Sequence, residues 1–425
     1  MNNLKFTITA QDGKARTGVI EINGKSVETP EFMSVATRAE VKTLSLDELN
    51  ELNVRMIICN TYHLMLEPGA DVVKKKGGLH KFMGGFKGIV ATDSGGFQAF
   101  SLGAGKEFGT NKLYFPKKED YKEFRKTPKL SKKDFERKRQ NSRLFKVLYK
   151  NKKKKQESFA DITDNGVKFK SVYDDSLQFL SPEKSIEVQE KLGADIILVL
   201  DECTSPLHSK KYNEKSLKRT HDWAKRCLSA RKTKQALVGI VQGSEWKDLR
   251  ERSAKFIASL PFDSYAIGGA LGKSKKEMYE IISWVVPHLK GGKPIHLLGV
   301  GTVEDLFECV ERGIDLFDCV TPTRMARFGY AYVSPPFGNK KNKFRYKINL
   351  KNSGSNEKPI DKNCNCKICK NYAQEELYNL KLRDKKLAHK FFTYHNVYFF
   401  LDLMRLIREA IRGGKFEELK RKWGI

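Results

Sequence analysis

The fold is indicated most directly by the stretch Ile314-Asp315-Leu316-Phe317-Asp318-Cys319-Val320-Thr321-Pro322-Thr323-Arg324. An apolar run ends in the carboxylate of Asp318, and a proline-containing turn with an arginine follows it. A parallel strand of an α/β fold delivers a reactive side chain to the mouth of a site in this way. The stretch therefore predicts a buried strand that ends in a candidate nucleophile, Asp318.

Short apolar runs of the same kind recur along the chain. Helix-period segments lie between most of them, at residues 182–192, 247–259, 276–289 and 303–312. Strand and helix alternating eight times is the pattern of a (β/α)8 barrel of the TIM type. The eight expected strands are residues 32–35, 54–59, 88–92, 195–200, 236–241, 264–267, 296–300 and 314–317.

The barrel is expected to have additions at both ends and one interruption. Residues 1–31 alternate apolar and polar side chains around Asp12-Gly13, which predicts an antiparallel β-hairpin or small sheet. We expect the catalytic barrel over residues 32–335, with a basic insertion at about 105–160. Residues 336–425 are expected to form a metal-binding subdomain with C-terminal helices.

The net charge of +29 over 425 residues points to a polyanionic partner, with nucleic acid first. No uninterrupted apolar run is long enough to span a membrane, and residues 1–20 lack a signal-peptide core. We therefore expect a cytoplasmic protein with no membrane association.

About half of that charge lies in residues 106–155, which hold 20 Lys and Arg against 6 Asp and Glu, with aromatic residues interleaved. The segment could be a solvated lysine-rich insertion with one helical stretch. It could equally be an arm that grips RNA, since basic side chains neutralise phosphates and aromatic rings stack on bases. The sequence leaves both interpretations open.

Three of the eight cysteines, Cys364, Cys366 and Cys369, fall within six residues, whereas the others are scattered singly and are expected to be reduced. With His395 they would give Zn2+ a complete tetrahedral shell and no open position for water, which makes the expected site structural. His389 is the competing fourth ligand. His395 is preferred because it directly precedes an amphipathic helix expected over residues 396–412.

Polar or glycine residues stand just past six of the expected strands. Taken singly, each fits a turn or a helix cap. Together they favour one shared site, because barrels of this kind collect the carboxyl ends of their strands on one face. The residues are Asn60, Asp93, Asp201, Gln242, Gly268-Gly269 and Asp318.

Two carboxylates at separate strand ends, Asp93 and Asp318, suit chemistry on a glycosidic bond, where one attacks the anomeric carbon and the other handles the leaving group's proton. Asp201 could recognise N–H donors of a heterocycle, or could simply cap a helix. Asp93-Ser94-Gly95-Gly96 also occurs around the nucleophile of trypsin-like proteases, but here it follows a strand of an alternating α/β chain. The glycines are better explained as a place where a flat ligand approaches the backbone.

These motifs, in their order along the chain, resemble the tRNA-guanine transglycosylase (queuine tRNA-ribosyltransferase) family. The resemblance covers nearly the whole chain apart from the basic segment, and the spacing from Cys369 to His395 matches the family's zinc site. The motifs are Asn60-Thr61-Tyr62-His63-Leu64, Asp93-Ser94-Gly95-Gly96-Phe97-Gln98, Phe179-Leu180-Ser181-Pro182-Glu183, Asp201-Glu202-Cys203, Val241-Gln242-Gly243, Gly268-Gly269, Gly299-Val300-Gly301, Phe317-Asp318-Cys319-Val320, Pro322-Thr323-Arg324 and the cysteine cluster.

The resemblance implies a homodimeric, zinc-containing, irregular barrel. Such an enzyme exchanges guanine 34 of tRNAs with GUN anticodons, those for Asp, Asn, His and Tyr, for a 7-deazaguanine in queuosine biosynthesis. It also implies a role for each matching residue. Asp318 would be the nucleophile towards ribose C1′, Asp93 the general acid/base, and Asn60 the residue that orients Asp93. The readers of the base would be Asp201, Gln242, Gly268 and Gly269; Phe97 and Leu298 would be the walls of its pocket, and Arg324 and Arg327 would contact the tRNA.

The incoming base is the open question. In having a cysteine at position 203, the chain resembles the bacterial enzymes, which take preQ1 as the incoming base. Queuine is the alternative incoming base. The loop from Ala270 to Lys273 lacks the Gly-Glu ending that is usual in the family.

Two other functions fit the sequence less well. A non-catalytic tRNA-binding partner subunit on the same fold would tend to lose the acids that this chain keeps. A zinc hydrolase would need ligands at strand ends, yet His296 is expected at the start of its strand and His63 stands alone.

Overall fold

The computed structural model describes residues 4–100, 160–204, 208–270, 274–336, 346–350 and 356–425. The basic segment, residues 106–155, and the loop residues 271–273 lie outside these ranges.

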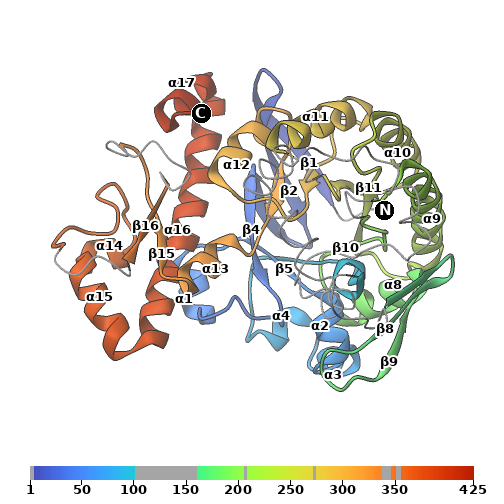
Figure 1. The fold of residues 1–425 in the computed structure, drawn as a ribbon, viewed down its shortest axis with the longest axis horizontal. Helices are drawn as coiled ribbons and strands as arrows, with labels where there is room; N and C mark the ends of the chain where they lie inside the picture. Colours follow the sequence, from blue (N-terminus) through green and yellow to red (C-terminus); the bar gives the residue numbers. More distant parts are fainter. Residues whose placement is uncertain (1–3, 101–159, 205–207, 271–273, 337–345, 351–355) are drawn as a thin grey trace, which may run out of the picture.

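Eight parallel strands close into a barrel, which confirms the predicted fold class (Figure 1). Hydrogen bonds run around the ring in chain order, and the last strand pairs with the first. Each strand falls on one of the eight apolar runs: β4 (Glu31–Ala36), β5 (Met56–Cys59), β6 (Ile89–Thr92), β10 (Ile196–Leu198), β11 (Ala236–Val241), β12 (Ser264–Ile267), β13 (Ile295–Leu297) and β14 (Leu316–Asp318).

Helices cover the outside of the barrel, so the strands are buried on both faces and read as continuous apolar runs. The predicted helices are present as α8 (Pro182–Leu192), α10 (Lys247–Ser259), α11 (Lys275–Val285) and α12 (Val303–Val310), joined by α9 (Lys210–Ala230). In α8, Ser181 caps the N-terminus, a proline follows in the first turn, and Gly193 ends the helix in the left-handed conformation. These local signals place the helix ends where the sequence predicted them.

The N-terminal sheet closes the bottom of the barrel, where the strands begin. It has three strands, β1 (Lys5–Asp12), β2 (Ala15–Ile22) and β3 (Lys25–Thr29), so the predicted hairpin or small sheet is confirmed as a small sheet. Arg16 of β2 pairs with Asp315 at 2.6 Å, and Lys25 of β3 pairs with Asp195 at 2.7 Å. Both carboxylates directly precede a barrel strand, so these ion pairs fix the sheet to the strand starts.

Asp195, Asp263 and Asp315 share a structural role at this bottom face. Each accepts a hydrogen bond from the backbone N–H of a neighbouring strand's residue, at 2.9, 2.7 and 2.7 Å respectively. Their carboxylates therefore hold the barrel together at the end that stabilises the fold.

Four short helices connect the first three barrel strands. The helices are α1 (Leu46–Glu51), α2 (Thr61–Leu66), α3 (Ala70–Lys75) and α4 (Leu79–Phe82). An antiparallel sheet of β7 (Ala160–Thr163), β8 (Gly166–Lys170) and β9 (Leu177–Leu180), which the sequence did not predict, precedes α8.

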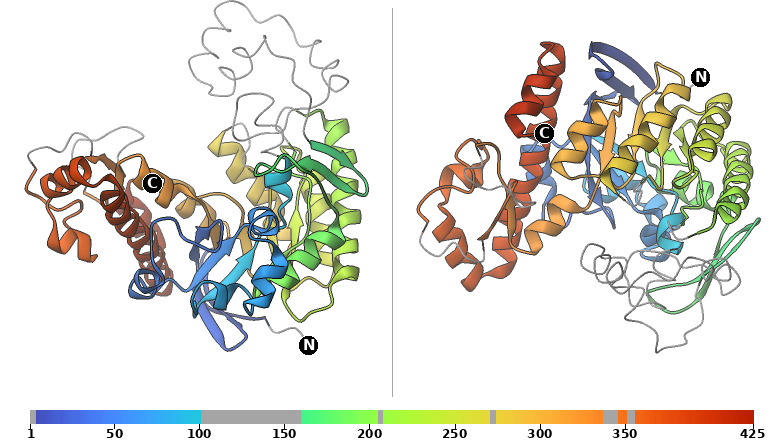
Figure 2. Two further views of the ribbon diagram at one scale, coloured as in Figure 1. Left: turned by 90° about the horizontal axis from the view of Figure 1, so that it is seen from below. Right: turned by 45° about the horizontal axis from the view of Figure 1, so that its top comes forward.

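The C-terminal region forms a layer beside the barrel (Figure 2). It contains α14 (Lys367–Asn371), α15 (Gln374–Arg383), α16 (Lys385–Arg412) and α17 (Phe416–Trp423), together with the paired strands β15 (Tyr330–Tyr332) and β16 (Lys347–Asn349). Helix α16 packs against α13 (Thr321–Arg327), against β4 and against the N-terminal sheet. It begins at Lys385, because Asp384 caps it there, so His395 lies inside the helix and the prediction that it directly precedes one was wrong.

Candidate active site and metal centre

The structure brings the predicted strand-end residues to one face of the barrel. Asp318 ends β14, Asn60 and Asp93 directly follow β5 and β6, and Gln242 directly follows β11. Asp201 lies three residues beyond β10, and Gly268-Gly269 follow β12. All eight strands are parallel, so their carboxyl ends meet at this face.

Asp93 is held by donors from two segments, the residues that directly follow β5 and those that follow Asp93 itself. Its Oδ1 accepts from the backbone N–H groups of Thr61 at 2.8 Å and Gly95 at 3.1 Å, and its Oδ2 accepts from the side chains of Asn60 and of Gln98, the latter at 3.0 Å. Burial raises the pKa of Asp93 to about 6, although these four hydrogen bonds act in the opposite direction. The carboxyl group can therefore exchange a proton near neutral pH.

Asp201 and Gln242 form a buried pair. The Gln242 Nε2 donates to Asp201 Oδ2 at 2.6 Å, and burial raises the pKa of Asp201 to about 6. The Gln242 Oε1 is buried and has no hydrogen-bond partner among the described residues. A buried acceptor without a donor is unfavourable, so this oxygen is available to a ligand N–H group.

Gly268 and Gly269 pack directly against Gln242. A Cβ on Gly268 would lie 2.5 Å from Gln242 Nε2, and one on Gly269 would lie 2.7 Å from Gln242 Oε1. Gly269 also has a φ of 57°, in the left-handed region. Only glycine lets the backbone approach Gln242 this closely in this conformation.

Arg250 of α10, which the sequence analysis missed, holds this glycine pair from behind. Its guanidinium is fully buried and donates to the carbonyls of Gly268 and Gly269, both at 2.7 Å, and to those of Val241 and Ser244. These bonds fix the two glycine carbonyls on the side of α10. No sequence signal distinguishes Arg250 from the many surface arginines of this basic chain.

The other predicted pocket residues surround the Asp201–Gln242 pair or the barrel mouth. Cys203 lies beside Gly269, and burial raises the pKa of its thiol to about 12, so it is a neutral thiol at physiological pH. Ala270 is buried, whereas the ring of Phe97 is about half exposed. Leu298, directly after β13, is partly buried.

His296 contacts the candidate nucleophile, and the sequence analysis missed this. It is the middle residue of β13, it is almost fully buried, and its Nε2 lies 2.9 Å from Asp318 Oδ1. The backbone N–H of Gly299 donates to the same oxygen at 3.0 Å. In the register, His296 pairs with Leu316, two residues before Asp318, so both side chains are on the same face.

Arg324 and Arg327 lie on α13, the helix that directly follows Asp318 and Cys319-Val320. They are three residues apart, so they are neighbours on the helix surface, and burial and the charge of Arg324 both lower the pKa of Arg327. Both side chains are partly exposed. The exposed ring of Phe328 follows them, so a basic and aromatic surface adjoins the nucleophile.

Comparison with known proteins places this chain in a family. The model of the queuine tRNA-ribosyltransferase family matches residues 11–132 and 143–424. The chain belongs to this family. A relative from Archaeoglobus fulgidus, named for the same enzyme, is 45% identical over 423 residues, which cover 99% of each chain. The queuine tRNA-ribosyltransferase of Roseiflexus sp. is 38% identical, over 99% of this chain and 99% of its own length. That of Caldanaerobacter subterraneus is 39% identical, over 100% of this chain and 97% of its own length.

The predicted family and enzyme class are thus confirmed: a queuine tRNA-ribosyltransferase is a pentosyltransferase. Residues 133–142, where the family match is interrupted, fall within the basic segment, and most of that segment lies inside the matched residues. No helix in the part of the chain that the structure describes is long and apolar enough to cross a membrane.

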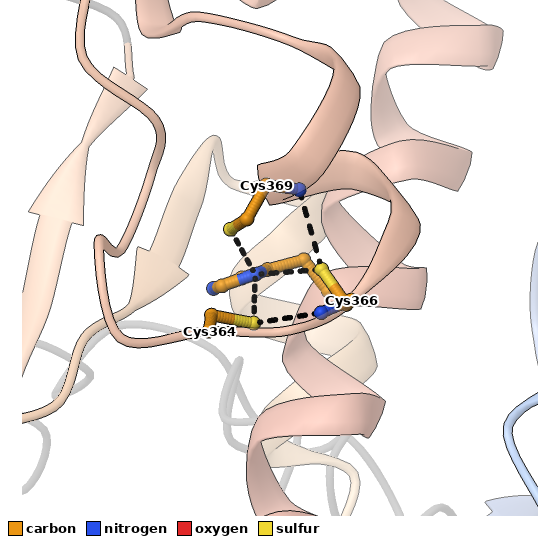
Figure 3. Close-up of side chains that lie close together, drawn as sticks. Cys364, Cys366 and Cys369 are labelled. Carbon is orange, nitrogen blue, oxygen red and sulfur yellow. Dashed lines mark hydrogen bonds between the residues drawn. The ribbon is translucent and has the colours of Figure 1, made fainter.

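The four predicted metal ligands of this queuine tRNA-ribosyltransferase converge as a closed cluster. The Sγ atoms of Cys364, Cys366 and Cys369 lie 3.7, 3.5 and 3.3 Å from His395 Nδ1 (Figure 3). A tetrahedral ion with bonds of about 2.3 Å to sulfur and 2.0 Å to nitrogen would set a separation of about 3.5 Å. The donor set and its spacing therefore fit a metal ion with no open coordination position.

A second contact fixes how His395 can bind. Its Nε2 lies 2.8 Å from the carbonyl oxygen of Tyr332, so that nitrogen carries the hydrogen and Nδ1 is left to bind a metal. The neighbouring Asn396 is fully buried and donates to the carbonyls of Pro322 and Tyr330 at 3.1 and 3.0 Å. The metal centre is thereby connected through α16 to the start of α13, the helix behind Asp318.

Proposed function

We propose that this chain exchanges guanine 34 of tRNAs with GUN anticodons, those for Asp, Asn, His and Tyr, for a 7-deazaguanine, preferably preQ1. The observation that carries the proposal is the convergence of three acids in different environments, Asp318, Asp93 and Asp201, at the carboxyl ends of the barrel strands. Membership of the queuine tRNA-ribosyltransferase family supplies the reaction class.

In the first displacement, an oxygen of Asp318 forms a bond to ribose C1′ while the bond from C1′ to guanine N9 breaks. The electron pair leaves with guanine, which takes a proton from Asp93. In the second displacement, N9 of the incoming base attacks C1′, the bond from Asp318 to C1′ breaks, and Asp93 takes up the proton of the incoming base. Two displacements retain the configuration at C1′, as an exchange of one base for another requires.

The pKa of about 6 suits Asp93 to this exchange, since both of its protonation states are accessible near neutral pH. Burial favours the protonated acid and the four donors around it favour the carboxylate, so Asp93 can both give and take up a proton. Asn60 orients it through its side-chain amide. The proton that Asp93 gives to the leaving guanine is replaced by the proton that it takes up from the incoming base.

For base recognition, the Asp201 carboxylate would accept N–H groups of the guanine edge, and Gln242 and the Gly269 backbone would complete the set. The close approach of Gly268 and Gly269 to Gln242 supports a slot for a flat ring. Phe97 and Leu298 would form its walls, with Cys203 and Ala270 beside the substituent of the incoming base. In having a cysteine at position 203, the chain resembles the bacterial enzymes. This resemblance favours preQ1 over queuine as the incoming base.

An anticodon loop is a suitable RNA target, because its bases are unstacked more easily than those of a duplex. Arg324 and Arg327 would hold its phosphates beside Asp318. The net charge of +29 agrees with such a polyanionic substrate. We propose a homodimer, as in the family that the sequence resembles.

The metal is proposed to be one structural Zn2+ per subunit, held by Cys364, Cys366, Cys369 and His395. Three thiolates and one imidazole are a donor set typical of structural zinc. Bound there, the ion would hold the C-terminal layer in its fold and would contribute nothing to the displacement itself.

The test is base exchange on a tRNA carrying labelled guanine at position 34, with preQ1 or queuine added separately. Wild-type protein should release the label and form a covalent protein–tRNA complex on a denaturing gel. Asp318→Asn should lose both activities by at least about 10⁴-fold, the order seen when a nucleophile is removed. Release of guanine by Asp318→Asn at the wild-type rate would show that the nucleophile is another residue.

The same assay separates the alternatives. A non-catalytic partner subunit would bind tRNA without releasing guanine, even as the wild-type chain. A faster exchange with queuine than with preQ1 would reverse the preference proposed for the incoming base.

A further inference from the structure

The two oxygens of the Asp318 carboxylate have different surroundings. Oδ1 accepts from the imidazole of His296 at 2.9 Å and from the backbone N–H of Gly299 at 3.0 Å. Oδ2 makes no hydrogen bond or ion pair within the described residues. The side chain of Asp318 is 17% exposed, so the carboxylate still reaches the barrel mouth.

The donors on Oδ1 are rigidly placed. His296 is only 3% exposed and lies within β13, whose register with β14 fixes its position relative to Asp318. An ionised carboxylate can only accept hydrogen bonds, so the Nε2 of His296 must carry the hydrogen. Gly299 supplies its N–H from the loop that directly follows β13, so both donors belong to the neighbouring strand and its extension.

From this asymmetry we propose that His296 is a positioning residue of the reaction and that Oδ2 of Asp318 is the oxygen that attacks ribose C1′. The proposal rests on the function proposed above, in which Asp318 is the nucleophile. The bond from Oδ2 to C1′ forms as the bond from C1′ to N9 breaks, and the guanine leaves with that electron pair and the proton from Asp93. His296 gives up no proton in this step.

The two donors assist both displacements. Before attack, they prevent rotation of the carboxylate and keep a lone pair of Oδ2 aimed at the substrate, which lowers the entropy lost in the reaction. In the covalent intermediate, Oδ1 is the carbonyl oxygen of an ester. It regains negative charge when the incoming base displaces the carboxylate, so donors already placed on Oδ1 stabilise that transition state.

The test compares two variants of the full-length, metal-loaded enzyme. His296→Leu removes the donor at similar volume, and His296→Gln returns an N–H donor on a side chain of similar length. We expect His296→Leu to lower kcat by about 100-fold, the order observed on loss of one oriented donor. KM values for tRNA and for the base should stay within about twofold, and His296→Gln should recover at least about 10-fold of the lost rate. His288→Leu, on the turn after α11, is the matched control and should leave kcat unchanged.

Each result has one meaning for the proposal. An unchanged kcat for His296→Leu would overturn it, as would a glutamine variant no faster than the leucine variant. If His296→Leu lowered the thermal unfolding midpoint and the tRNA affinity in parallel with kcat, the proposal would also be overturned, because His296 would then have a purely structural role. Failure of the wild-type chain to form a covalent complex that Asp318→Asn abolishes would instead refute the function on which the proposal rests.

Discussion

Asp201→Asn should make this enzyme more stable and less active. Burial raises the pKa of Asp201 from 3.8 to about 6 in the native protein, because the ionised carboxylate is disfavoured in its pocket. Only 7% of the residue is exposed, so solvent screens the charge little. Asparagine has almost the same shape, can still accept from Gln242, and carries no charge to bury.

The magnitude follows from proton linkage. Each pKa unit corresponds to about 1.36 kcal/mol, so a shift of about two units destabilises the ionised native state by about 3 kcal/mol. Below pH 3.8 both the native and the unfolded carboxyl are protonated, and the effect is absent. It grows as the unfolded carboxyl ionises between pH 4 and 6, and it is complete above pH 6. The gain in unfolding free energy should therefore be about 1 kcal/mol at pH 4.5 and about 3 kcal/mol at pH 8.

Urea unfolding followed by tryptophan fluorescence, at pH 4.5 and pH 8, would measure this gain. Asp47→Asn, at an exposed position in the first turn of α1, is the matched control and should change stability by less than about 0.5 kcal/mol. In the exchange assay, Asp201→Asn should lower kcat/KM for the base by at least about 100-fold, because the pocket loses an acceptor. A gain that is equal at the two pH values, or no gain at pH 8, would refute the claim that Asp201 is kept as a disfavoured charge for base recognition.

Three further outcomes are expected. Chelation of the metal, or Cys366→Ser, should unfold the C-terminal layer, and it should lower activity because α16 of that layer packs against α13 behind Asp318. The protease resistance of residues 356–425 measures the unfolding. A layer that stays intact without metal would contradict this prediction. Gly269→Ala should raise KM for the base by at least about 10-fold with little effect on tRNA affinity. The added Cβ would clash with Gln242, and the φ of 57° at this position is unfavourable for alanine. Steady-state kinetics with varied base concentration tests this, and an unchanged KM would count against the proposed slot. Deletion of residues 106–155 should weaken tRNA binding and flatten its dependence on salt, whereas equal affinity at physiological salt would show that the segment is only solvated.

Much of the fold could be predicted because its signals are local. The eight barrel strands are buried on both faces, so each is a continuous apolar run, and α8 carries its cap, its proline and its terminal glycine in sequence. The sheet of β7, β8 and β9 was missed because its strands are short and half exposed, and β7 directly follows the basic segment. Helix α16 was predicted to start after His395, whereas its buried residues already follow helical spacing from Ala388 and Phe392, and the cap at Asp384 marks the true start.

By itself, the sequence determined the barrel, the family, the three acids at strand ends and the four metal ligands, because each depends on residue type and spacing along the chain. The tertiary structure alone decided that Asp195 and Asp315 hold the bottom of the barrel while Asp201 and Asp318, a few residues later, face the site. It also decided that His296 and Arg250 belong to that site. These assignments depend on which strands are neighbours and in what register, and the free energy of strand pairing comes from residues far apart in the sequence.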